Sequence, residues 1–123
     1  MGDKTIKTGV VFILKRPTGD VLLQLRDSND LKFPNQWCFP GGSKEEEDKD
    51  YIDTVLREAK EEYNILLRPE GCELIDVYSI DDFVQNNHVY VCKVGTKQNL
   101  KMNEGADMKW VTPREVEKID LGF

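Results

Sequence analysis

Three carboxylates occupy one turn of a predicted helix near the middle of the chain. Glu58, Glu61 and Glu62 stand at i, i+3 and i+4, where helical side chains are neighbours and like charges repel. A divalent cation would turn this repulsion into binding, because Mg²⁺ and Mn²⁺ prefer hard oxygen ligands such as carboxylates. The alternative is a solvated acidic helix face, which is the usual role of a charge run. The spacing alone leaves both interpretations open.

Apolar residues at helical spacing predict the helix that must position these carboxylates. Between Asp50 and Tyr63 they form one face, made of Ile52, Val55, Leu56, Ala59 and Tyr63. At roughly 100° per residue, the glutamates fall on the opposite and flanking sides of the helix. Glu62 borders the apolar face and Glu61 points furthest from the core. The carboxylates are therefore expected to line a cleft between the helix and a sheet.

The turn that precedes the helix extends this pattern into a longer motif. Read from Gly42, the chain presents Gly42, Asp48, Arg57, Glu58, Ala59, Glu61, Glu62, Asn64 and Ile65. This series resembles the signature of the Nudix hydrolases, G-x5-E-x7-R-E-U-x-E-E-x-G-U, where U is aliphatic. The resemblance covers most of the chain, and its specific part runs from Trp37 to Ile65.

The chain departs from the signature at three points. Asp48 replaces a glutamate, eight residues instead of seven separate it from Arg57, and Asn64 replaces the late glycine. Asn is the residue other than glycine that best tolerates a left-handed conformation after a helix. A longer acidic loop from Ser43 to Asp50 would absorb the extra residue, which leaves the role of Asp48 open.

The resemblance implies a set of site residues. Metal would be held by Glu58, Glu61, Glu62 and the backbone of Gly42, joined by Glu104 from a later loop, for which Asp107 is the nearest alternative. Catalytic roles fall on Arg57, Glu58 and Glu61, with Arg57 orienting Glu58 through a charge-assisted pair.

Other residues are weaker candidates. Arg26 ends a strand and could meet a substrate phosphate, or be an ordinary surface arginine; Trp37 could border a base-binding pocket, or pack in the core. The single histidine, His88, is more consistent with a structural role than with catalysis. The acidic run from Glu45 to Asp50 is expected to be a solvated loop and helix N-terminus.

Composition limits the classes of protein that the chain can represent. With 123 residues, 39% of them apolar, it fits one domain over residues 1–123, with the Nudix box at about 42–65. The N-terminus does not resemble a signal peptide and the longest early apolar run is far too short for a membrane span, so a soluble, cytoplasmic protein is expected. The three cysteines form no C-x-x-C pair, so reduced thiols are expected.

The net charge of the chain limits the kinds of molecule that it is expected to bind. A formal net charge of −6 argues against a surface that binds duplex nucleic acid, which requires a basic stripe. A small nucleotide is the expected partner, and no membrane partner is indicated. The sequence does not indicate an oligomeric state.

Strand and turn signals predict the sheet. Strands are expected at Thr8 to Leu14, Val21 to Arg26, Leu74 to Ile80, His88 to Val94 and Met108 to Val111. Trp37 to Phe39 leads into a Pro-Gly-Gly turn, and Thr112 to Glu115 carries a capping box that starts a short terminal helix. The fold class is therefore α/β (α+β), a mixed sheet flanked by helices, which the resemblance sharpens to the Nudix α/β/α sandwich.

The resemblance implies a Mg²⁺-dependent hydrolase, with Mn²⁺ as an alternative cofactor. It would cleave the pyrophosphate linkage of a nucleoside diphosphate joined to another group, with MutT-like (d)NTP pyrophosphohydrolysis as the leading subtype. ADP-ribose, nucleotide sugars and dinucleoside polyphosphates are alternative substrates. A Nudix-fold module that binds a nucleotide or regulates without hydrolysis is the alternative from another class. An EF-hand is excluded, because the loop frames that begin at Asp27 and Asp48 lack the required glycine and terminal glutamate.

Overall fold

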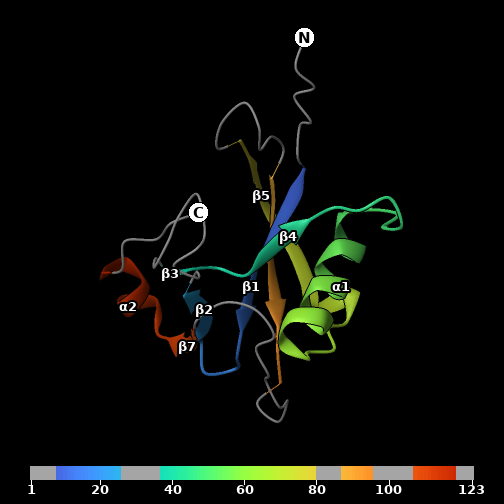
Figure 1. The fold of residues 1–123 in the computed structure, drawn as a ribbon. Coiled ribbons are helices and arrows are strands. Elements are labelled where there is room, and N and C mark those ends of the chain that lie inside the picture. Colours follow the sequence, from blue (N-terminus) through green and yellow to red (C-terminus); the bar gives the residue numbers. More distant parts are fainter. Residues whose placement is uncertain (1–7, 26–36, 80–86, 96–106, 119–123) are drawn as a thin grey trace.

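The computed structural model describes residues 8–25, 37–79, 87–95 and 107–118 (Figure 1). Its strands are β1 (Gly9–Lys15), β2 (Val21–Leu25), β3 (Trp37–Cys38), β4 (Gly41–Ser43), β5 (Cys72–Tyr78), β6 (Asn87–Lys93) and β7 (Asp107–Val111). Its helices are α1 (Tyr51–Tyr63), the 3₁₀ turn η1 (Pro69–Gly71) and α2 (Pro113–Lys118). The predicted strands and both predicted helices are present, with ends shifted by at most two residues.

The seven strands form one mixed sheet. Its main order is β3-β2-β1-β6-β5, while β4 also pairs with β1 and β7 with β2. β1 and β6 are parallel and the other pairs are antiparallel. Figure 1 shows α1 and α2 on opposite sides of this sheet. The α/β sandwich predicted from the sequence is therefore confirmed.

The short strand β4 corrects the prediction of a plain Pro-Gly-Gly turn. Gly41 and Gly42 run antiparallel to the first half of β1, opposite Val11 and Val10. A Cβ atom built on Gly41 would lie 2.6 Å from the Val10 carbonyl oxygen. Glycine is needed here because the two backbones approach too closely for a side chain. This pairing places Gly42 beside α1.

The main core fills the space between α1 and the sheet. It includes Phe12 and Leu14 on β1 and Val55, Ala59 and Tyr63 on α1, all of them buried. The rings of Phe12 and Tyr63 meet edge to face, with centroids 6.3 Å apart. The apolar stripe of α1 thus fixes the side of the helix that faces the sheet.

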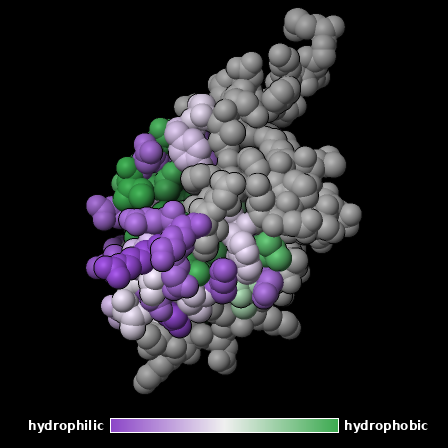
Figure 2. Space-filling model, turned by 90° about the vertical axis from the view of Figure 1, so that its left-hand side faces the viewer, coloured by the Kyte–Doolittle hydropathy of each residue, from purple (hydrophilic) through white to green (hydrophobic). Residues whose placement is uncertain are grey.

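A second, smaller cluster lies on the other face of the sheet, beneath α2. Val21, Leu23 and Val111 form its buried part, and Phe39 and Val116 pack against it. Viewed from the α2 side, the described surface is largely hydrophilic, with smaller hydrophobic areas between the polar ones (Figure 2). Within the described residues, no helix is long and apolar enough to cross a lipid bilayer.

Both ends of α1 are closed by local interactions. At the start, the Asp50 side chain accepts a hydrogen bond from the backbone N–H of Asp53 at 3.1 Å. At the end, Asn64 adopts the left-handed conformation with φ 57°, as predicted for the residue that replaces the glycine of the signature. The Ile65 N–H then reaches back to the Ala59 carbonyl and the Asn64 N–H to the Lys60 carbonyl, both at 3.1 Å, so these two carbonyls of the last turns are satisfied. These caps set the register of the glutamates between them.

Candidate functional site

α1 brings the three predicted carboxylates together. One carboxylate oxygen each from Glu58, Glu61 and Glu62 lies within 4.8 Å of the other two. Glu61 is exposed and the other two are half-buried, so the cluster opens to solvent on one side. Glu61 indeed points furthest from the core, with 55% of its side chain exposed.

Gly42 lies directly against this cluster. A Cβ atom on Gly42 would collide with the Glu58 side chain and would lie 2.6 Å from Glu58 Oε1. Glycine therefore leaves the space that the Glu58 carboxylate occupies. The pairing of β4 with β1 holds the Gly42 backbone in this place, so the strand and the helix build the site together.

Arg57 connects the carboxylates of α1 to the preceding acidic loop. On the helix side, its Nη1 donates to Glu58 Oε1 at 3.1 Å and to Glu61 Oε2 at 3.4 Å. On the loop side, its Nη2 donates to the Ser43 carbonyl at 3.1 Å, and Nη1 lies 3.6 Å from a Glu45 oxygen. The predicted pair between Arg57 and Glu58 is present, within a larger network.

Asp48 is the strongest partner of Arg57. Arg57 Nε and Nη2 donate to the two Asp48 oxygens at 3.1 and 2.9 Å, which is the bidentate geometry of a strong ion pair. Asp48 also accepts hydrogen bonds from the Thr54 hydroxyl and the Glu45 N–H, both at 2.9 Å. The carboxylate is 5% exposed and fully surrounded by donors.

These contacts shift both ionisation equilibria. Hydrogen bonding to Arg57 holds the pKa of Asp48 well below its usual range, against the opposing effect of burial. The same hydrogen bond raises the pKa of Arg57. Asp48 therefore carries a buried negative charge at neutral pH that Arg57 neutralises.

The burial of Asp48 corrects the prediction of a wholly solvated acidic loop. Glu45, Glu46 and Glu47 are exposed as expected, but Asp48 folds inward. The extra residue lies in the loop and the short turn before Tyr51, so Asp48 still reaches Arg57 despite its longer separation. Its place at the position of the first glutamate in the signature was the available signal for this role.

Thr54 could not be identified as part of this network from the sequence. It is fully buried on α1, and its hydroxyl donates to Asp48 Oδ2. A threonine six residues after an aspartate carries no pattern that predicts the contact. The contact forms because the loop folds back over the first turn of the helix.

The residues present fit a divalent cation. The cluster offers oxygen donors and three negative charges, which matches the ligand preference of Mg²⁺ and Mn²⁺ and not that of soft metals. Gly42 leaves room for the Glu58 carboxylate at the base of this cluster. No other group of three such ligands is found in the described part of the chain.

The remaining candidates are more scattered. Trp37 is half-buried, packs against the α2-side cluster, and carries the Lys109 ammonium 4.2 Å from its ring centroid. His88 stacks on Tyr51 with ring centroids 3.7 Å apart, which accords with a structural role. Asp107 begins β7 at an exposed position. Arg26 and Glu104 lie outside the described residues.

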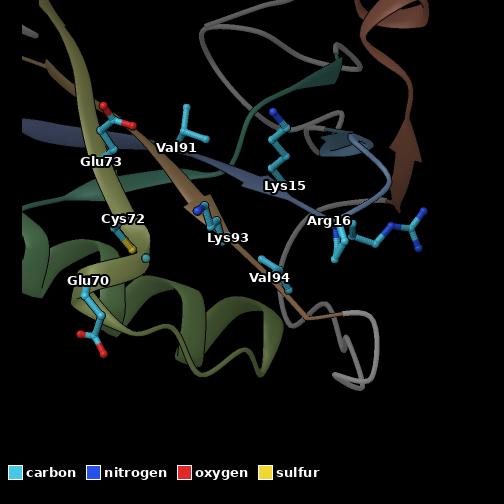
Figure 3. Close-up of a pocket in the computed structure, with 10 residues that line it drawn as sticks. Lys15, Arg16, Glu70, Cys72, Glu73, Val91, Lys93 and Val94 are labelled. Atoms are coloured by element: carbon cyan, nitrogen blue, oxygen red, sulfur yellow. The ribbon is translucent and has the colours of Figure 1, made fainter.

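One described cavity is separate from the carboxylates. It measures about 500 Å³, and its walls include Lys15, Glu70, Cys72, Glu73 and Lys93 (Figure 3). Lys15 is the last residue of β1, whereas Gly42 pairs with the first half of that strand. The cavity therefore lies toward the other end of β1 and is not part of the carboxylate cluster.

Fold and site define a Nudix-type α/β protein, and comparison with known proteins agrees. The family model described as NUDIX domain matches residues 5–122. The chain therefore belongs to the NUDIX family.

Part of the chain is similar in sequence to known Nudix proteins. It is 37% identical over 68 residues to the uncharacterized Nudix hydrolase NudL of Pectobacterium atrosepticum. The matched segment covers 55% of this chain and 34% of that protein. NudL of Escherichia coli O1:K1 is 35% identical over 80 residues, or 65% and 41% of the two chains. The matches thus span less than half of the length of these two relatives.

Solved structures share the fold at low identity. The NUDIX domain of Shewanella oneidensis NrtR, complexed with ADP ribose, has a TM-score of 0.75 at 24% identity and covers 97% of this chain and 80% of its own. MutT from Methanosarcina mazei Go1 has a TM-score of 0.73 at 19% identity, covering 100% and 88%. A C. elegans Ap4A hydrolase has a TM-score of 0.70 at 20% identity, covering 93% and 85%.

Proposed function

We propose that this chain is a Mg²⁺-dependent hydrolase of a pyrophosphate linkage in a nucleoside diphosphate joined to another group. The observation that carries the proposal is the convergence of Glu58, Glu61 and Glu62 beside Gly42 in a chain of the NUDIX family. MutT-like (d)NTP pyrophosphohydrolysis is the leading subtype. ADP-ribose, nucleotide sugars and dinucleoside polyphosphates are the alternative substrates, and structural neighbours include a domain bound to ADP ribose and an Ap4A hydrolase.

Glu58, Glu61, Glu62 and the Gly42 carbonyl would hold the cation, with Mn²⁺ as a possible substitute and Glu104 as a further proposed ligand. A bound divalent cation supplies charge stabilisation at a phosphoryl oxygen and lowers the pKa of a coordinated water. The three glutamates bring the negative charge that a cation needs for binding at this exposed face. Arg26 and Trp37 are proposed to contact the substrate.

Arg57 acts as a positioning residue in this proposal. Its guanidinium donates to Glu58 and Glu61 and is itself fixed by two hydrogen bonds to Asp48. This arrangement holds the two carboxylates in place and reduces their mutual repulsion before a cation binds. The acidic loop thus prepares the helix for its ligand.

The first test measures product formation from a panel of nucleoside triphosphates, ADP-ribose, nucleotide sugars and dinucleoside polyphosphates with Mg²⁺, Mn²⁺ or EDTA. Glu61→Gln and Glu62→Gln each remove one charged ligand and keep the side-chain size. Each is expected to lower kcat by about 10²-fold or more. Glu46→Gln, at an exposed loop position, is the matched control and should retain wild-type turnover.

The result separates hydrolysis from binding alone. Cleavage that requires metal and is lost in both site variants supports the proposal and identifies the substrate class. Folded wild-type protein that binds a nucleotide but forms no product with either metal would instead favour a non-catalytic nucleotide-binding module.

A further inference from the structure

Cys72 and Cys92 face each other across two antiparallel strands. The register of β5 and β6 pairs these two residues directly, although twenty positions separate them in the chain. Directly opposed residues in antiparallel strands have Cα atoms about 4.5 or 5.5 Å apart. Both separations lie within the range of about 4.4–6.8 Å that a disulfide bond spans. The Cα separation of this pair therefore allows a bond between the two sulfurs.

The two cysteines lie on the same face of the sheet in the reduced state. All three cysteines of the chain are free. Cys92 belongs to the buried main core and Cys72 packs against that core, so both side chains lie on the face of the sheet that α1 covers. The Cys72 thiol donates to the Arg68 carbonyl oxygen at 3.4 Å. Direct pairing in the register and a shared face of the sheet therefore make the two thiols nearest cross-strand neighbours.

Their surroundings give the two cysteines different reactivity. Cys92 is fully buried, whereas Cys72 is half-buried and lines the cavity described above, where β5 begins (Figure 3). Interaction with Cys92 lowers the pKa of Cys72, and the same interaction together with burial raises the pKa of Cys92. Cys72 is thus the accessible, attacking thiol, and Cys92 is the buried, resolving thiol.

We propose that Cys72 and Cys92 form a reversible dithiol–disulfide site that reacts with low-molecular-weight disulfides. The Cys72 thiolate attacks one sulfur of the reagent, forms a mixed disulfide and releases one thiolate, which takes up a proton. The Cys92 sulfur then loses its proton and attacks the Cys72 sulfur, and the second reagent thiol leaves. The reagent disulfide gains two electrons and becomes two thiols, and the protein dithiol becomes one disulfide.

The test uses oxidised glutathione on the folded wild-type chain, followed by alkylation of the remaining thiols and peptide mapping by mass spectrometry. The expected product is a peptide linked through Cys72 and Cys92, with Cys38 still alkylated, and dithiothreitol should reverse the link. A stable glutathione adduct as the end product, a link that includes Cys38, or an unreacted wild type would each overturn the proposal.

Single variants test the order of the two steps. Cys92→Ser should accumulate glutathione on Cys72, because the second thiol is missing. Cys72→Ser should react with glutathione far more slowly than the wild type, because the remaining thiol of the pair, Cys92, is buried. Cys38→Ser is the matched control, a buried cysteine outside the pair, and should behave like the wild type. Adduct on Cys92 in the Cys72 variant, formed at the wild-type rate, would overturn the assigned order.

Discussion

Asp48 and Arg57 form the contact on which the geometry of the carboxylate cluster depends. The aspartate is buried, accepts two hydrogen bonds from the guanidinium, and fixes the side of Arg57 that faces the loop. The other side of Arg57 is then directed to Glu58 and Glu61. A residue that contacts no proposed ligand therefore positions those that do.

Asp48→Asn should lower the free energy of unfolding at neutral pH by about 3 kcal/mol. This value is the lower end of the range for breaking a buried ion pair, and we expect the lower end because Arg57 stays partly exposed to water. Urea unfolding measures this change. Glu46→Gln, an exposed neighbour in the same loop, should change stability little.

The effect of Asp48→Asn should also depend on pH. The folded-state pKa of Asp48 is lowered, by Arg57 on α1 and by the Glu45 N–H and Thr54 hydroxyl around it. Its contribution is thus fully present above the unfolded pKa of about 3.9 and is lost as pH falls through the folded value. The difference between wild type and variant should therefore shrink below about pH 4. A difference that stays constant down to pH 2 would contradict the ion-pair interpretation.

Gly42 shows how a missing side chain contributes to the site. Gly42→Ala should displace the Glu58 carboxylate, because a Cβ atom would lie 2.6 Å from Glu58 Oε1. If the proposed hydrolysis is correct, turnover should fall by about 10²-fold, the typical effect of displacing a group by about 1 Å. Gly95→Ala is the control, since nothing lies within 4 Å of its added methyl group. Equal activity of both variants in a kinetic assay would argue against this role of Gly42.

At the scale of elements, α1 is defined by its ends as much as by its apolar face. Asp50 caps the start, and Asn64 reverses the chain with φ 57° so that Ile65 enters the core. The Asn64 and Ile65 N–H groups satisfy the carbonyls of Lys60 and Ala59. The last turn, which carries Glu61 and Glu62, is held in place by this cap.

Asn64→Ala should lower the free energy of unfolding by about 1 kcal/mol, because alanine pays the steric cost of the left-handed conformation. Asn64→Gly, which restores the residue of the family signature, should be as stable as the wild type or slightly more stable. Thermal unfolding compares the three proteins. If Asn64→Ala were as stable as Asn64→Gly, the left-handed conformation at this position would contribute little to the choice of residue.

At the scale of the whole molecule, the two helices on opposite faces of the sheet have different roles. α1 packs on the main core and carries the carboxylates, while α2 covers the smaller cluster of Val21, Leu23 and Val111. The cavity with Cys72 lies at a third place, toward the far end of β1. The structure thus separates the proposed hydrolytic site from the proposed thiol site.

Val55→Ala tests whether the packing of α1 on the core can be weakened without a loss of catalytic activity. The truncation removes two methyl groups from a fully buried position and should lower the free energy of unfolding by about 2 kcal/mol. Val116→Ala, on the half-buried face of α2, should cost less. If the proposed hydrolysis is correct, both variants should keep the wild-type kcat below the unfolding temperature, because both side chains belong to the core clusters and not to the proposed ligands. Denaturant titration and the activity assay check the two halves of this prediction, and a kcat loss in Val55→Ala would contradict the second.

The sequence by itself determined the local features of this protein. The apolar stripe, the capping residues and the spacing of Glu58, Glu61 and Glu62 all lie within one helix, where periodicity fixes which side chains are neighbours. The capping box of α2 is local in the same way: the backbone N–H of Thr112 donates to Glu115 Oε1 and the backbone N–H of Glu115 to the Thr112 hydroxyl. Strand and turn signals predicted the mixed sheet and its flanking helices, and the family signature sharpened this prediction to the Nudix sandwich.

Only the tertiary structure decided the contacts between segments that are distant in the chain. The turn at Gly41 and Gly42 became a strand because β1 offered a partner, and Asp48 was buried because Arg57 and Thr54 satisfy its charge and hydrogen bonds. The pairing of Cys72 with Cys92 follows from the register of two strands, to which the linear spacing of cysteines gives no clue. Such contacts depend on which backbones meet, and that is settled by the packing of the whole sheet and not by any one segment.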